Sequence, residues 1–95
     1  MRLSKTYRDT IKKNFYSIFK QGKIYLFGSR IDDTQKGGDI DLYLVIDNNQ
    51  NLFHKKIKFL AQIKRALGEQ KIDVIFNENP NRLIEQEAIK WGIEL

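Results

Sequence analysis

The chain has no cysteine, one histidine, one proline and one tryptophan among its 95 residues. The absence of cysteine excludes disulfide bonds, thiolate catalysis and cysteine-based zinc sites, and it fits a reducing compartment. No apolar run approaches the roughly 20 residues that a membrane-spanning helix needs. The N-terminal segment MRLSKTYRDTIKK also lacks the apolar stretch of a secretory signal. We therefore expect a cytoplasmic protein that does not enter the membrane.

Length and charge limit the possible functions less sharply. Ninety-five residues fit one small domain, residues 1–95, without room for a second core. The net charge of +5 favours an anionic partner, which could be a nucleotide, a nucleic acid or an acidic protein surface. A solvated basic surface explains the charge equally well. Much of the positive charge forms one basic group, consisting of Lys55, Lys56, Lys58, Lys64, Arg65 and Lys71.

The apolar pattern predicts six elements separated by polar loops. Apolar residues at helical spacing predict helices over Thr6–Lys20, Leu52–Leu67 and Asn81–Trp91. Runs of β-branched and aromatic residues predict strands over Lys23–Phe27, Asp39–Ile46 and Lys71–Phe76. The order α-β-β-α-β-α indicates an α+β fold, either two-layered or sandwiched, with helices packed on a short mixed sheet of three strands.

Details at the two ends of the chain give further expectations. Thr6, with Asp9 three residues later, is the pattern of a capping box at the start of the first helix. Ile84, Ala88 and Trp91 share one face of the last helix and are expected to form core or interface. The tail WGIEL is a candidate contact with a partner.

The stretch FGSRIDDTQKGGDIDLYLV, residues 27–45, carries the first candidate chemistry. Asp39 and Asp41 are two residues apart in a predicted strand, so they point to one side while Ile40 and Leu42 point to the core. Two adjacent carboxylates repel each other, and a divalent cation such as Mg²⁺ removes that repulsion. The alternative is a pair of solvated aspartates on an exposed strand face.

A glycine–serine turn precedes these carboxylates. Gly28 follows the first predicted strand directly and allows the backbone to pass close to a ligand. Ser29 and the neighbouring backbone N–H groups could cradle a phosphate, and Arg30 adds a guanidinium that could grip it. Alone, a Gly-Ser pair is an ordinary turn, but here it would face a metal site across a bound triphosphate.

A third carboxylate, Asp73, lies in the predicted strand KIDVIF. A charge between apolar strand residues is costly unless it has a partner. If this strand neighbours DIDLYLVI, Asp73 reaches the same cluster and could accept a proton from an attacking hydroxyl. The alternative is an aspartate at a sheet edge that pairs with a lysine.

These linked motifs resemble the nucleotidyltransferase superfamily that shares the DNA polymerase β palm fold. The family pattern is a GS turn, a spacer, DxD, and a third acidic residue on a later strand, and the resemblance covers nearly the whole chain. The small size is similar to the minimal nucleotidyltransferases, the MNT group. One departure is the spacer between Ser29 and Asp39, which holds nine residues where the commonly quoted minimal form has ten.

The resemblance implies a role for each matching residue. Gly28 and Ser29 would hold the phosphates of a nucleoside triphosphate, by default ATP. Asp39 and Asp41 would bind Mg²⁺ ions. Asp73 would be a further metal ligand and the base.

The resemblance also implies a partner. Minimal members are typically paired with a helical HEPN-type protein as antitoxin and toxin, and they are similar to protein AMP-transferases that modify a tyrosine of that protein. We therefore expect transfer of AMP to a HEPN-type partner, in a homo- or hetero-oligomer. The competing hypothesis is an inert module that neutralises its partner by contact alone, although intact carboxylates speak against decay of the site. Nucleic acid is not expected as a direct ligand, because most aromatic residues lie at helical core spacing and not on an exposed sheet.

Overall fold

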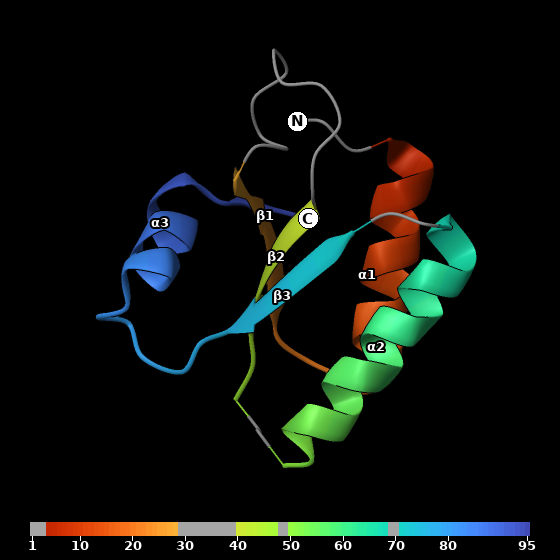
Figure 1. Cartoon of the computed structure of the whole chain (residues 1–95), viewed down its shortest axis with the longest axis horizontal. Coiled ribbons are helices and arrows are strands. Elements are labelled where there is room, and N and C mark those ends of the chain that lie inside the picture. Colours follow the sequence, from red (N-terminus) through yellow and green to blue (C-terminus); the bar gives the residue numbers. More distant parts are fainter. Residues whose placement is uncertain (1–3, 29–39, 48–49, 69–70) are drawn as a thin grey trace.

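The computed structural model describes residues 4–28, 40–47, 50–68 and 71–95 (Figure 1). The elements in these ranges are α1 (Lys5–Phe19), β1 (Lys23–Phe27), β2 (Ile40–Val45), α2 (Leu52–Leu67), β3 (Ile72–Phe76), α3 (Leu83–Trp91) and β4 (Ile93–Glu94). All six predicted elements are confirmed, with ends that differ by at most two residues. The short strand β4 is an additional element. None of the described helices is long and apolar enough to cross a membrane.

The strands form one mixed sheet in the order β3-β2-β1-β4. Strand β1 is antiparallel to both β2 and β4, whereas β2 and β3 are parallel. Figure 1 shows α1 and α2 together on one side of the sheet and α3 on the other. The α+β fold is therefore confirmed in its sandwiched form, and β3 is an edge strand of the described sheet.

The main core lies between the sheet and the pair α1 and α2. Alternate strand residues such as Leu26 and Leu42 point into it and are fully buried. Phe15 from α1 and Phe59 from α2 meet edge-to-face above them, with ring centroids 6.4 Å apart. A smaller cluster on the opposite face, formed by Phe27, Tyr43 and Ala88, holds α3 against the sheet. Among the described residues, the side of α1 and α2 thus carries the larger buried apolar cluster and the side of α3 the smaller one.

The first helix begins earlier than predicted. Ser4 is its N-cap, and the Ser4 hydroxyl accepts a hydrogen bond from the backbone N–H of Tyr7 at 3.2 Å. Thr6 lies inside the first turn, so the capping box of Thr6 and Asp9 is wrong. Ser4 precedes the first apolar helical position by three residues, which is the spacing that lets its side chain reach an unpaired N–H of the first turn.

The C-terminal tail belongs to the fold. Strand β4 pairs with β1, and the Leu95 backbone N–H donates to the Ile24 carbonyl at 2.9 Å. Leu95 is buried in the main core, whereas Trp91 and Ile93 of the same tail are exposed, so the partner contact expected of this tail stays a prediction. On the predicted face of α3, Ala88 belongs to the core, whereas Trp91 and Ile84 are 58% and 43% exposed, so for these two residues the interface alternative stays a prediction.

Candidate active site

Two of the predicted carboxylates lie side by side on adjacent strands. Asp41 of β2 pairs with Asp73 of β3, and Asp41 also pairs with Phe27 of β1. Residues opposite each other in neighbouring strands point to the same face of a sheet, and neighbouring strands are about 4.8 Å apart. Both carboxylates therefore project from the side of the sheet that carries α3. The condition set for Asp73, that its strand neighbours the strand of Asp41, is therefore met.

The opposite face of the same strands fixes this orientation. Ile40 and Leu42 are fully buried on the side of α1 and α2, and Ile72 and Val74 are 5% and 6% exposed on that side. A slip of one residue in either strand would turn the two apolar side chains named for that strand toward solvent and bring its carboxylate into the core. Burial of the apolar residues thus positions the two acids, as predicted for Ile40 and Leu42.

Gly28 lies directly against Asp41. Its φ of +77° is in the region that favours glycine. A Cβ atom at this position would collide with Oδ2 of Asp41 and would lie 3.2 Å from its Cγ. The close approach of the Gly28 backbone to the Asp41 carboxylate places Gly28, the first residue of the predicted glycine–serine turn, against the acidic pair. Both the backbone conformation and the space beside Asp41 therefore favour a glycine here.

A groove of about 370 Å³ opens beside the acidic pair. Asp41 and Asp73 line it together with Phe27 from β1, Ile84 from α3, and Lys56 and Leu60 from α2. Because α2 and α3 lie on opposite faces of the sheet, the groove passes around the outer edge of β3. It places a lysine from the predicted basic group near two carboxylates and could admit an anionic ligand.

The acidic pair suits Mg²⁺ as the metal. Mg²⁺ takes oxygen ligands and usually retains one or two carboxylates together with water and substrate phosphates. In the described ranges no group of three or more His, Cys, Asp or Glu side chains is placed to hold a metal ion. Asp41 and Asp73 are thus the donors that this part of the chain supplies. Ser29, Arg30 and Asp39 lie outside the described residues, so their roles stay predictions.

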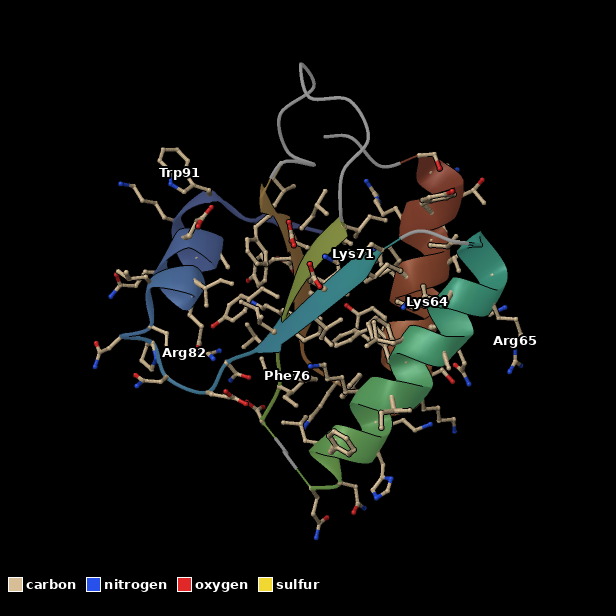
Figure 2. The ribbon with its side chains drawn as sticks, in the orientation of Figure 1. Lys64, Arg65, Lys71, Phe76, Arg82 and Trp91 are labelled. Atoms are coloured by element: carbon tan, nitrogen blue, oxygen red, sulfur yellow. The ribbon has the colours of Figure 1, made fainter. Side chains whose placement is uncertain are left out.

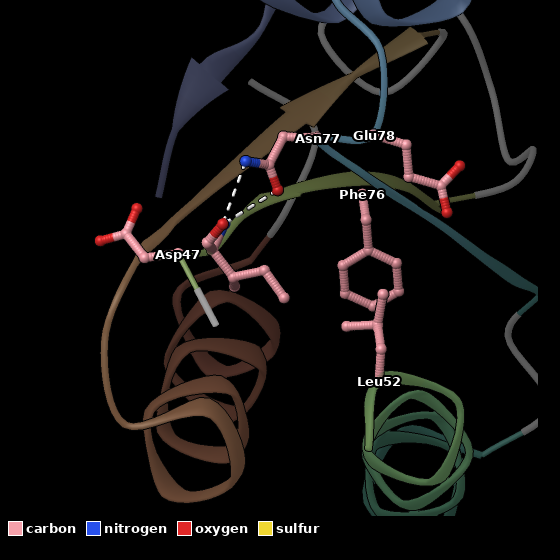
Figure 3. A pocket seen from close by; sticks show the side chains of 6 residues that line it. Asp47, Leu52, Phe76, Asn77 and Glu78 are labelled. Atoms are coloured by element: carbon pink, nitrogen blue, oxygen red, sulfur yellow. Dashed lines mark hydrogen bonds between the residues drawn. The ribbon is translucent and has the colours of Figure 1, made fainter. Parts of the chain in front are cut away.

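A second cleft lies at the other end of the sheet (Figure 3). It measures about 320 Å³ and is lined by residues just beyond the ends of β2 and β3, including Asp47, Asn77 and Glu78. The Asn77 amide closes this end of the sheet, because it both accepts from the Ile46 N–H and donates to the Ile46 carbonyl, each at 3.0 Å. The cleft contains none of the predicted site residues, and its Asn77 amide is occupied in holding the backbone.

A buried polar network holds α3 over the acidic face, and sequence reasoning did not predict it. Glu85 is 1% exposed. One carboxylate oxygen accepts from the Tyr43 hydroxyl at 3.0 Å, and the other accepts from the Asn79 backbone N–H and the Arg82 Nε at 2.7 and 2.8 Å. Arg82 also donates to the Phe76 carbonyl at 3.2 Å. The network ties α3 and the preceding loop to β2 and β3, and thereby places Ile84 in the wall of the groove.

The network shifts two pKa values. Burial, together with the hydrogen bond to Glu85, raises the pKa of Tyr43 to about 12. Burial alone would raise the pKa of Glu85, but the hydrogen bonds from Asn79, Arg82 and Tyr43 outweigh burial and hold that pKa below its usual value. Glu85 is therefore ionised and fully engaged in the fold. Its only sequence signal is an acidic residue between Ile84 and Ala88 on the predicted apolar face.

Comparison with known proteins agrees with this geometry. The family model described as "Polymerase beta, Nucleotidyltransferase" matches residues 9–95. The chain therefore belongs to the polymerase β-like nucleotidyltransferases, and its small size is consistent with the minimal group of that family. A search of curated proteins found no significant match.

Proposed function

We propose that the protein transfers AMP from ATP, with Mg²⁺, to a hydroxyl of a partner protein, and that this hydroxyl belongs to a tyrosine of a HEPN-type toxin for which the chain is the antitoxin. The observation that carries the proposal is the register of Asp41 opposite Asp73, with Gly28 packed against the first of them. Membership of the nucleotidyltransferase family supports the reaction class. The partner and the nucleotide follow from the resemblance to minimal members of that family.

The reaction is a displacement at the α-phosphorus. The acceptor oxygen forms a bond to that atom, the bond to the oxygen bridging toward the β-phosphate breaks, and pyrophosphate leaves. Asp73, which is more exposed than Asp41, takes the hydroxyl proton and returns it to solvent. Asp41 and Asp73, with Asp39, would hold Mg²⁺, which when bound neutralises the triphosphate and lowers the pKa of the acceptor.

The test is transfer of label from α-labelled ATP in the presence of Mg²⁺ and a HEPN-type protein. With the wild-type chain we expect label on the HEPN-type protein. With Asp41→Asn or Asp73→Asn we expect the transfer rate to be at least 100-fold lower. Asp47→Asn is the matched control, because Asp47 is an exposed aspartate beyond the opposite end of β2. Calorimetric titration with Mg²⁺ gives a second readout, in which the first two variants bind more weakly and the control does not.

The outcomes separate the parts of the proposal. Equal rates for Asp41→Asn and the wild type would refute the assignment of the site. ATP binding without any labelled protein would refute the acceptor. Loss of both ATP binding and label from the wild-type protein would favour the contact-only module.

A further inference from the structure

Among the described residues, the outer edge of β3 presents backbone groups that pair with no other strand, next to the acidic pair. Strand β3 is terminal in the described sheet and pairs only with β2 there. Figure 2 labels Lys71 just before this strand and Phe76 at its end. The Ile40 N–H donates to the Lys71 carbonyl at 3.0 Å, and the Asn77 N–H donates to the Leu44 carbonyl at 3.3 Å. Lys71 and Asn77 thus turn their backbone groups toward β2.

In a parallel ladder, alternate residues of a strand direct their backbone groups to the same neighbour, and this determines which way the residues between Lys71 and Asn77 face. Asp73 and Ile75 also face β2, whereas Ile72 and Val74 direct their N–H and carbonyl groups to the outer side. At the end of the strand, the Phe76 carbonyl accepts from Arg82 and from the Glu78 N–H. The outward groups of Ile72 and Val74 are a template for one more strand.

A continuous hollow follows this edge. The groove beside Asp73 reaches Lys56 of α2, and a second hollow of about 280 Å³ continues from Lys56 to Phe53, Phe76 and Glu78. Phe53 is 71% exposed at the far end. The two hollows share Lys56 and together run the length of β3. Their shape suits an extended chain, whose alternate side chains would enter the α2 side and the α3 side in turn.

We propose that the acceptor is bound as an extended peptide that adds a strand to the outer edge of β3. This inference rests on the proposed function and specifies how its substrate is held. A side chain of the peptide on the α3 side lies beside Asp73, where its hydroxyl oxygen meets the base and the nucleotide. The next side chain along the peptide lies on the α2 side beside Lys56, which favours an acidic residue there. Main-chain hydrogen bonds supply affinity, and these two positions supply specificity.

The arrangement separates the two substrates. Gly28 lies on the β1 side of Asp41, so phosphates held beside Gly28 would lie over the inner strands of the sheet and not at its β3 edge. Asp73 lies on the edge strand, so the peptide approaches from the opposite side. An aligned attack requires the acceptor oxygen and the leaving pyrophosphate to lie on opposite sides of the α-phosphorus, and the fold provides this separation.

The probe is a set of synthetic peptides with a central tyrosine and randomised flanking residues, assayed with the full chain, Mg²⁺ and α-labelled ATP. We expect acidic residues to be enriched at the positions next to the tyrosine. N-methylation of successive peptide bonds should lower the rate at least tenfold at every second position and little between, because only alternate N–H groups face β3. Equal sensitivity at all positions would overturn the proposal.

Two pairs of variants test the edge itself. Val74→Pro removes an outward N–H while leaving the ladder with β2 intact, and Val74→Ala is its control for lost packing. We expect Val74→Pro to lower peptide labelling at least tenfold relative to Val74→Ala, with ATP binding unchanged. Lys56→Glu should convert the acidic preference to a basic one, and Lys58→Glu, an exposed lysine that does not line the groove, should leave it unchanged.

The failures are distinguishable. Label on a folded HEPN-type protein but on no peptide would overturn strand addition and leave the proposed function standing. Label on neither would overturn the proposed function. A dimer of this chain that Val74→Pro dissociates would show that the edge of β3 binds a second copy and would overturn the peptide proposal.

Discussion

Replacing Gly28 by alanine should affect the stability of the fold slightly and the rate of nucleotidyl transfer strongly. Gly28 and Gly68 both have positive φ, +77° and +83°. An added Cβ at Gly28 meets the carboxylate of Asp41, whereas an added Cβ at Gly68 meets nothing within 4 Å. Gly68→Ala therefore also places an alanine at a positive φ, but without the collision. The ψ of −150° at Gly68 lies in a region that is essentially restricted to glycine, so this variant controls for backbone strain away from the site.

The expected magnitudes follow from these contacts. An L-residue at positive φ costs about 1–2 kcal/mol, of which about 0.4–1 kcal/mol is recovered because alanine restricts the unfolded chain. Gly28→Ala should thus lose roughly 1 kcal/mol of unfolding free energy from backbone strain, and Gly68→Ala about 1–3 kcal/mol, because its backbone conformation is less accessible to alanine. The atom struck at Gly28 is the end of a side chain, so the Asp41 carboxylate rotates away at a further cost of about 0.5–1.5 kcal/mol. A displacement of about 1 Å at a reacting centre lowers the rate on the order of 100-fold.

Urea unfolding followed by circular dichroism measures the unfolding free energy. Label transfer measures the rate, and calorimetry measures Mg²⁺ binding. We expect Gly28→Ala to remain folded, to lose about 100-fold in transfer rate and to bind Mg²⁺ more weakly. Gly68→Ala should keep the wild-type rate. Equal rates for the two variants would show that Gly28 does not position the Asp41 carboxylate, and the link between the turn and the acidic pair would be refuted.

Three predictions concern the fold that supports the site. Glu85→Gln should lower the unfolding free energy by about 3 kcal/mol, because it removes the charge that holds a buried network together; Glu87→Gln, at an exposed position of α3, should change it by less than about 0.5 kcal/mol in the same urea experiment. The raised pKa of Tyr43 stabilises the fold fully below about pH 10, the ordinary tyrosine value, and this contribution is lost as the pH rises toward 12. The wild type should therefore lose about 2 kcal/mol more unfolding free energy than Tyr43→Phe between pH 10 and pH 12. Equal losses in the two proteins would refute this assignment to Tyr43. Phe59→Ala, at a fully buried position, should cost about 3–5 kcal/mol, whereas Phe53→Ala, at a position 71% exposed, should change thermal stability little.

Most of the fold was predictable because its elements are periodic. The apolar spacing of Ile11 and Phe15 identifies the buried face of the first helix, and both residues are fully buried. In the second helix Ile63 of the predicted face is fully buried, whereas Phe53 and Ile57 of that face are 71% and 51% exposed. Strand β4 was not predictable, because two residues are too few to show an alternating pattern. They form a strand only by pairing with the edge of β1 in the folded sheet. The start of α1 was misplaced, since several polar residues near the N-terminus could serve as a cap and only the chain path selects one.

Some residues of the candidate site could likewise be predicted from the sequence, and others could not. The sequence identifies Asp41, Asp73 and Gly28 as polar or flexible residues at the ends of strands, where chemistry is expected. It does not identify Glu85, because a buried carboxylate depends on donors from Tyr43 and Arg82 that are distant in sequence or turned inward by the loop.

By itself, the sequence determined which residues can carry the chemistry and which strand faces they occupy, because side-chain alternation and apolar burial are local properties. Only the tertiary structure decided that the strand of Asp73 lies parallel to the strand of Asp41 and in register with it, since pairing depends on how α2 returns the chain across the sheet. It also decided that Asp73 lies on an open edge, and this position follows from the order of the strands and not from any one of them.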